Sequence, residues 1–108
     1  MGSIKYNKLV RDRIPEIIEA NGKKAIYDIL SDEKYIEFLN RKLIEELNEY
    51  LGNGDVEELV DMGEVIHAIL EYKGITIQEF QRIRSEKEEK NGGFKKRILL
   101  KEVIEWIE

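Results

Sequence analysis

Apolar residues recur at helical spacing through the middle of the chain. Between positions 35 and 51 they fall every three or four residues, at Tyr35, Ile36, Leu39, Leu43, Leu47 and Leu51. That spacing puts them on one stripe of a helix. Ser31 or Asp32 can cap its first turn, and Gly52-Asn53-Gly54 interrupts it. The pattern therefore predicts a helix from about residue 32 to residue 51.

A second apolar pattern follows this glycine-rich break. Its members are Val56, Leu59, Val60, Met62, Val65, Ile66, Ile69 and Leu70. They cover much of the circumference of a helix, which indicates a central position in the fold. Asp55 and Glu58 have the spacing of a capping box at its start, and Gly74 is a stop signal at its end.

The flanking segments predict two further helices. Pro15 suits the first turn of a short helix that reaches about Asn21. Thr76 with Glu79 forms another capping box, which opens a polar helix to about residue 90. Residues 25–30 and 96–100 leave open a small two-stranded β element, and residues 101–107 a last helical turn. We expect a single, mainly all-α domain over residues 1–108.

Composition narrows the classes of function. The 108 residues suit one domain, and the 38% of charged residues exceeds the usual quarter. The net charge of −5 argues against binding polymeric nucleic acid, and zero cysteines exclude disulfides and thiolate zinc sites. Because no apolar run opens the chain, we expect no signal peptide, no membrane partner and a cytoplasmic location.

The two central helices carry paired carboxylates. Glu46 and Glu49 lie three residues apart, as do Glu58 and Asp61, so each pair shares a helix face. If the helices form an antiparallel hairpin about Asn53, Glu49 comes level with Glu58 and Glu46 with Asp61. Four carboxylates would then converge between two helices with apolar facing sides.

Converging carboxylates favour a hard cation. They repel one another and raise each other's pKa unless a cation neutralises them. Oxygen ligands without His or Cys suit Mg²⁺, or Mn²⁺, and Mg²⁺ commonly bridges to phosphates. The alternative is a solvated acidic face on which Glu58 only caps a helix. The mirrored spacing about a tight turn favours the metal site.

Three segments together resemble a known family. They are the EExxE and ExxD motifs between Glu45 and Asp61, the opening Lys8–Pro15, and the late Gly92–Ile98. This combination resembles the MazG-like all-α nucleotide pyrophosphohydrolases, which include phosphoribosyl-ATP pyrophosphatases and helical dUTPases. The resemblance extends over nearly the whole chain, as in one branch of small family members.

The resemblance implies a site and a reaction. The positions that match the family's metal ligands are Glu46, Glu49, Glu58 and Asp61. Glu45 and Glu64 are further candidates beside them. Family members bind Mg²⁺ there and cleave between the α and β phosphates with an activated water. Only eight residues separate Glu49 from Glu58, fewer than in many members, which affects the expected nucleobase pocket more than the metal ligands.

Other residues are candidates for substrate contacts and catalysis. Glu49, with Glu46, is the candidate catalytic carboxylate, and Glu49 is our choice to accept the water proton. Candidate phosphate-binding residues are Lys8, Arg11, Arg13, Lys95 and Arg97, which could instead pair with some of the 23 acidic residues. Phe94 is a candidate for base stacking or for the core. His67 is a candidate catalytic group or a structural histidine.

The carboxylate pattern and the family resemblance together predict a Mg²⁺-dependent nucleoside triphosphate pyrophosphohydrolase, for which clearance of non-standard nucleotides is one open role. The first alternative is the same reaction on phosphoribosyl-ATP in histidine biosynthesis. The second is a non-catalytic acidic helical binding protein. We expect a nucleotide as the substrate. A homodimer or homotetramer is expected because the apolar helix of residues 56–70 has few other elements to cover it.

Overall fold

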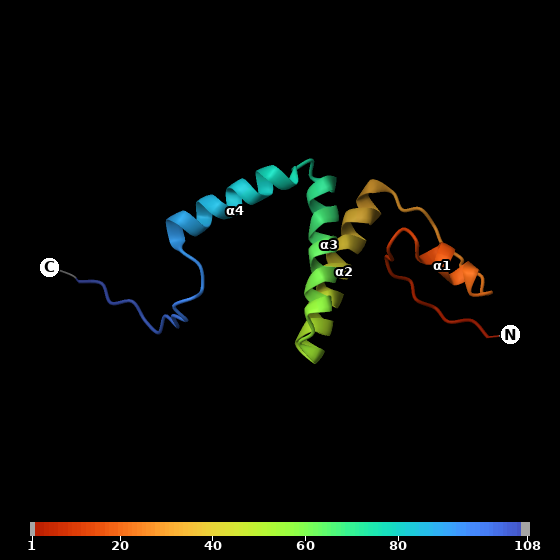
Figure 1. The fold of residues 1–108 in the computed structure, drawn as a ribbon, viewed down its shortest axis with the longest axis horizontal. Helices are drawn as coiled ribbons and strands as arrows, with labels where there is room; N and C mark the ends of the chain where they lie inside the picture. Colours follow the sequence, from red (N-terminus) through yellow and green to blue (C-terminus); the bar gives the residue numbers. More distant parts are fainter. Residues whose placement is uncertain (1, 107–108) are drawn as a thin grey trace. The chain divides into compact units, whose positions relative to one another are not determined.

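The computed structural model describes residues 2–106, and within this range it contains helices and no strand. The helices are α1 (Ile14–Ala20), α2 (Asp32–Asn53), α3 (Val56–Tyr72) and α4 (Ile77–Asn91) (Figure 1). The predicted all-α class is therefore confirmed. The chain divides after Ile75 into two units, each described by itself below, and the expectation of one domain stays a prediction.

Helix α2 has the ends that its sequence predicts. The Ser31 hydroxyl accepts a hydrogen bond from the Lys34 amide at 3.4 Å, which satisfies a free donor of the first turn. At the other end Gly54 has a φ of 70°, in the left-handed region that glycine adopts without steric cost. Its amide donates to the Tyr50 carbonyl at 2.7 Å and closes the last turn.

The capping box predicted at the start of α3 is wrong. Asp55 occupies the N-cap position, but its side chain accepts no hydrogen bond there. The Asp55 amide instead donates to the side-chain oxygen of Asn53 at 2.8 Å. Asn53 also donates from Nδ2 to Glu58 Oε1 at 3.4 Å. The Asn53 side chain thus accepts the hydrogen bond from the Asp55 amide in place of the Glu58 side chain. Glu58 is therefore free to contact the neighbouring carboxylates.

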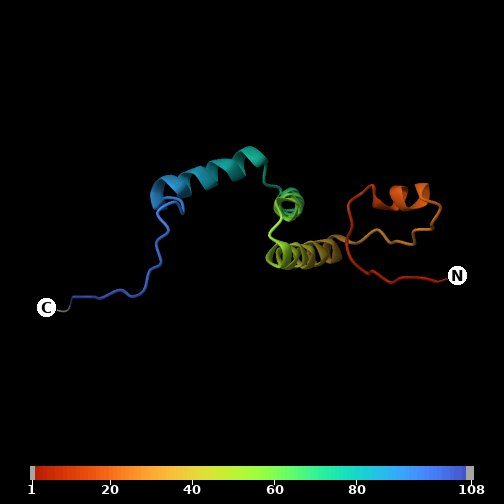
Figure 2. The same cartoon turned by 60° about the horizontal axis from the view of Figure 1, so that its bottom comes forward.

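Helices α2 and α3 pack against each other as an antiparallel hairpin. Helix α3 overlaps α2 in Figure 1 and is seen nearly end-on beside it in Figure 2. Leu39 on α2 and Val65 and Leu70 on α3 are the buried apolar residues of the described chain. At the open end of the hairpin the rings of Tyr35 and Tyr72 meet edge to face, with centroids 6.1 Å apart. These contacts fix the register in which acidic residues of the two helices face each other.

The N-terminal segment, residues 2–13, leads into α1, which has Pro15 in its first turn as predicted. It contacts both helices of the hairpin through ion pairs of Lys8 and Arg11, described below. Residues 25–30 form no strand, and Ile26 and Ile29 are exposed. A two-stranded element is marginally stable unless it packs on other structure, and this segment has no such cover.

The second unit contains α4. The Thr76 hydroxyl accepts a hydrogen bond from the Glu79 amide at 3.1 Å, which confirms that half of the predicted capping box. Residues 96–100 form no strand, so the two-stranded alternative is absent from the described chain. Residues 101–106 form no helical turn, and the predicted turn's last residue, Ile107, lies outside the described residues. Between residues 2 and 106, no helix has the length and hydropathy that crossing a membrane requires.

Candidate metal centre

Three carboxylates from two helices meet inside the hairpin. Glu46 of α2 and Glu58 and Asp61 of α3 each present an oxygen, and these oxygens lie within 4.8 Å of one another. Glu58 and Asp61 share a face because they are three residues apart. The short turn at Asn53 brings Glu46 opposite them. The structure thus brings together three of the four carboxylates expected from the sequence.

The centre of this cluster is buried. The Glu46 residue is 5% exposed, although it is a carboxylate on a two-helix hairpin. The buried Oε2 atoms of Glu46 and Glu58 have no hydrogen-bond partner among the described residues. An unpartnered buried carboxylate oxygen is costly, and a cation or a shared proton removes that cost. The hard oxygen donors and their convergence fit Mg²⁺ or Mn²⁺.

The environment raises the pKa of two carboxylates of α2, Glu46 and Glu49. Burial raises the pKa of Glu46, and hydrogen bonding with Glu58 and the charge of Asp61 act in the same direction against the opposing charge of Lys42. Hydrogen bonding with Glu58 also raises the pKa of Glu49, and the charge of Glu46 adds to it. The cluster therefore affects the pKa of Glu49, although Glu49 lies outside the set of three carboxylates.

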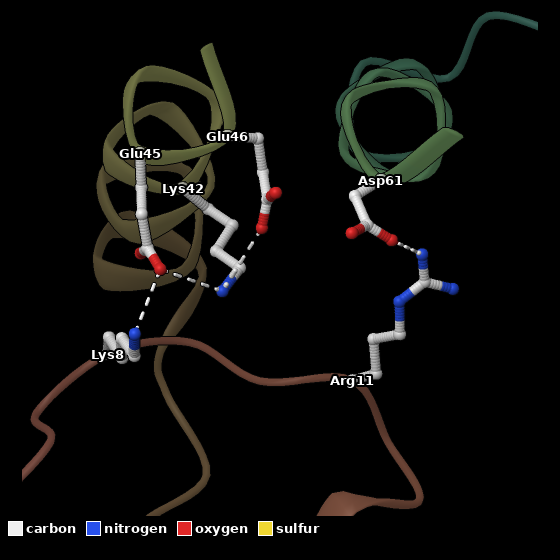
Figure 3. A network of polar contacts seen from close by, with 6 residues as sticks. All are labelled: Lys8, Arg11, Lys42, Glu45, Glu46 and Asp61. Atoms are coloured by element: carbon white, nitrogen blue, oxygen red, sulfur yellow. Dashed lines mark hydrogen bonds and ion pairs between the residues drawn. The ribbon is translucent and has the colours of Figure 1, made fainter. Parts of the chain in front are cut away.

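Basic side chains of the N-terminal segment and of α2 contact the acids on the side of that segment (Figure 3). Arg11 Nη2 lies 2.7 Å from Asp61 Oδ1, and Lys8 Nζ lies 2.9 Å from Glu45 Oε1. Lys42 Nζ lies 3.4 Å from the same Glu45 oxygen and 3.5 Å from Glu46 Oε1. Lys8 and Arg11 thus hold the N-terminal segment to acids of both helices.

These contacts have consequences for Glu45 and Lys8. Burial acts to raise the pKa of Glu45, but the hydrogen bond from Lys8 and the charges of Lys42 and Lys8 together lower it. The hydrogen bond to Glu45 raises the pKa of Lys8. Both shifts favour the charged pair. Glu45 thus differs from Glu46, whose charged form is disfavoured.

Sequence reasoning missed Lys42 and Asn53. Lys42 precedes Glu45 by three residues and Glu46 by four, which is the spacing of helical ion pairs, so a signal was present. This signal does not stand out, because α2 has other ion pairs at the same spacing. The sequence pattern marks Asn53 only as part of a helix break, whereas its side chain bonds both the Asp55 amide and Glu58.

The remaining predicted site residues lie elsewhere. Arg13 pairs with Glu16 at 3.0 Å rather than with the cluster, and Glu64 is exposed. His67 Nδ1 is 3.8 Å from Glu71, an exposed contact within α3. Phe94 is 98% exposed, so its alternative as a core residue is wrong for the described chain. Lys95 and Arg97 belong to the second unit, and their phosphate-binding role stays a prediction, as does base stacking by Phe94.

A small hollow lies beside the cluster, between the N-terminal segment and α2. Its volume of about 40 Å³ has room for ordered water and is far too small for a nucleotide. Its lining residues are Asn7, Lys8, Leu9, Phe38, Arg41, Lys42 and Glu45. Three of them are basic, and each is ion-paired with a glutamate of α2.

Comparison with known proteins gives one limited similarity. A protein of Mycolicibacterium smegmatis, described only as an uncharacterized protein, is 50% identical over 42 residues. The matched region is 39% of this chain and 43% of that protein, so the match spans less than half of either. No protein-family profile matches the chain. No solved structure matches it either.

Proposed function

We propose that this chain is a Mg²⁺-dependent nucleotide pyrophosphohydrolase. It would cleave a nucleoside triphosphate between the α and β phosphates and release a monophosphate and pyrophosphate. The observation that carries the proposal is Glu46, a carboxylate 5% exposed whose Oε2 has no partner among the described residues. It lies within ligand distance of Glu58 and Asp61. The resemblance of the EExxE and ExxD motifs to MazG-like enzymes supports the same activity.

The distribution of charge supports a phosphate substrate. An acidic centre alone would repel nucleotides, but Lys8, Arg11 and Lys42 lie around it. Guanidinium and ammonium groups are the usual partners of phosphate oxygens. A bound divalent cation would add neutralisation of the phosphates and a lowered pKa for bound water. Carboxylates that can bind a metal ion next to basic groups that can bind phosphates suit a metal–nucleotide complex as the substrate.

The chain's own residues would divide the work as follows. Glu46, Glu58 and Asp61 would hold the cation. Arg11 would orient the phosphates, together with Lys8, which would keep its contact with Glu45. Water would attack the α phosphorus, and the bond from that phosphorus to the bridging oxygen would break, so pyrophosphate leaves with the electron pair. Glu49 lies beside Glu58 and is exposed, which supports a role for it in accepting the proton of the water.

The geometry favours this proposal over a non-catalytic acidic binding protein. Binding by charge mimicry requires carboxylates that face a partner through solvent. Here Glu46 is buried and faces other carboxylates, an arrangement that costs stability unless a ligand compensates it. Phosphoribosyl-ATP remains the alternative substrate for the same chemistry.

A pyrophosphate-release assay across a panel of nucleoside triphosphates and phosphoribosyl-ATP tests the proposal. We expect release with Mg²⁺ or Mn²⁺, none in EDTA, and a loss of at least about a hundredfold in Glu46→Gln. Glu57→Gln is the matched control, since it removes an exposed carboxylate next to Glu58. Release of orthophosphate alone, full activity in EDTA, or equal activity of both variants would contradict the proposal.

A further inference from the structure

The ion pair between Arg11 and Asp61 places a permanent cation on a candidate metal ligand. The Arg11 guanidinium donates to Asp61 Oδ1 at 2.7 Å, and Asp61 belongs to the three-carboxylate set. Lys8 makes the corresponding contact on the other helix, but with Glu45, which is outside that set. In Figure 3 Arg11 reaches Asp61 from the N-terminal segment, while Glu46 approaches from the opposite helix. Arg11 thus differs from Lys8 because its partner, Asp61, is a candidate metal ligand.

We infer that Arg11 is an exchangeable counter-cation that leaves Asp61 when the metal binds and then contacts the phosphates of the substrate. This inference rests on the proposed metal centre. A guanidinium and a divalent cation on the same carboxylate repel each other, so they compete for Asp61. The guanidinium is always charged, so it leaves Asp61 as a cation and requires a new anion.

Two features of the N-terminal segment make the exchange feasible. Arg11 and Asp61 have side chains about half exposed, 52% and 40%, so the pair breaks at modest cost in a screened environment. The segment stays attached through Lys8 and Glu45 when Arg11 is released, since these two residues do not belong to the metal set. Arg11 would then move while its segment keeps its place beside the cluster.

The exchange predicts opposite effects of one substitution on two ligands. Arg11→Ala should bind Mn²⁺ about twofold to fivefold more tightly than the parent, since the metal no longer displaces an exposed ion pair. With Mn²⁺ saturating, it should bind inorganic triphosphate more weakly than the parent. A residue with only a structural role would weaken both ligands when removed.

Calorimetric titration of Mn²⁺, and then of inorganic triphosphate, into the full chain measures both effects. Arg13→Ala is the matched control. It removes the same charge at a position two residues from Arg11, and the Arg13 side chain is paired with Glu16 rather than with the metal set. It should leave Mn²⁺ affinity closer to the parent value than Arg11→Ala does. Equal or weaker Mn²⁺ binding by Arg11→Ala, or an equal gain in Arg13→Ala, overturns the inference.

The parent protein provides a test without any substitution. The side-chain Nε–H resonance of Arg11, followed by NMR, should shift on saturation with Mg²⁺ and again on addition of inorganic triphosphate. A resonance unchanged by Mg²⁺ overturns the exchange even if Mg²⁺ binds. If the parent binds neither Mg²⁺ nor Mn²⁺, the metal centre itself fails. If it binds them and exchanges Arg11 but releases no pyrophosphate from any nucleotide, only the proposed hydrolase activity fails.

Discussion

Lys42 lies one turn before Glu46 on α2, and its ammonium nitrogen is 3.5 Å from the Oε1 atom of that buried carboxylate. Both side chains are mostly buried, with exposures of 19% and 7%. Glu46 thus keeps one cationic neighbour on its own helix, while its other oxygen, Oε2, has no partner among the described residues. The charge of Lys42 offsets only part of the effect of burial, because the pKa of Glu46 is still raised.

This relationship makes Lys42 important for stability. We expect Lys42→Met to lower the free energy of unfolding of the metal-free protein by about 1–3 kcal/mol, since it leaves Glu46 without that cation. In the Glu46→Gln background the same substitution should cost less, because the charge that Lys42 balances is gone. Urea unfolding of the four proteins in EDTA measures the coupling. Equal costs in both backgrounds would show that Lys42 acts only through Glu45 or through packing.

The raised pKa of Glu46 predicts how stability depends on pH. As pH rises past the ordinary glutamate pKa of 4.5, Glu46 loses its proton in the unfolded chain but retains it in the folded chain, where its pKa is raised. The contribution of Glu46 to stability is therefore fully present below pH 4.5. It falls as pH rises through the raised folded pKa, above which it is lost.

Glu46→Gln should accordingly gain stability relative to the metal-free parent as pH increases from about 4.5, until the difference levels off. Urea unfolding in EDTA across this range gives the difference at each pH. Glu57→Gln again serves as the control on an exposed carboxylate. A difference for Glu46→Gln that is constant with pH, or one that shrinks as pH rises, would contradict the raised pKa.

The helices and the carboxylate pairs were predictable because local rules determine them. Ser31, Gly54 and Thr76 are end signals that work through contacts within a few residues, and the structure uses each of them. The meeting of Glu46 with Asp61 followed from counting residues on either side of Asn53, since a tight turn leaves an antiparallel pair little freedom of register.

The rest depends on choices that local rules leave open. Asp55 and Glu58 satisfied the capping-box spacing, but Asn53 had an equally short route to the Asp55 amide. Lys8 and Arg11 could have paired with many carboxylates, and only the three-dimensional arrangement shows that they reach Glu45 and Asp61. Strand pairing between residues 25–30 and 96–100 required a contact between segments distant in sequence. The periodicity within each segment gives no evidence for such a contact.

Like-charge repulsion in the cluster predicts a trade between activity and stability. Glu49→Gln is the informative variant, because the pKa of Glu49 is raised by its hydrogen bonding with Glu58 and by the charge of Glu46. Asp61→Asn is less clean, since it also removes the ion pair with Arg11. In EDTA, Glu49→Gln should melt at or above the temperature of the parent. With Mg²⁺ present, its activity should be lower than that of the parent by orders of magnitude.

Adding Mg²⁺ should raise the melting temperature of the parent more than that of Glu49→Gln, because a ligand stabilises a fold only as far as it binds to it. Thermal unfolding followed by circular dichroism, with EDTA or with a series of Mg²⁺ concentrations, gives both comparisons. Small and equal Mg²⁺ effects on the two proteins, with activity retained in the variant, would exclude Glu49 from the site.

Exposed apolar residues near the closed end of the hairpin bear on the expected self-association. Leu51 on α2 is 70% exposed, and Val56 and Val60 on α3 are 68% and 62% exposed. They are only a few residues from the turn at Asn53. Exposed apolar groups favour association with another surface.

We therefore expect light scattering at micromolar concentration to give at least twice the mass of one chain. Leu51→Lys should shift the protein toward the monomer, because it replaces an exposed apolar side chain at this end of the hairpin with a charge. Ile26→Lys is the control, since Ile26 is 90% exposed in the segment between α1 and α2, outside the hairpin. A monomeric parent would refute self-association. An equal loss of mass in both variants would show that this end of the hairpin is not the contact.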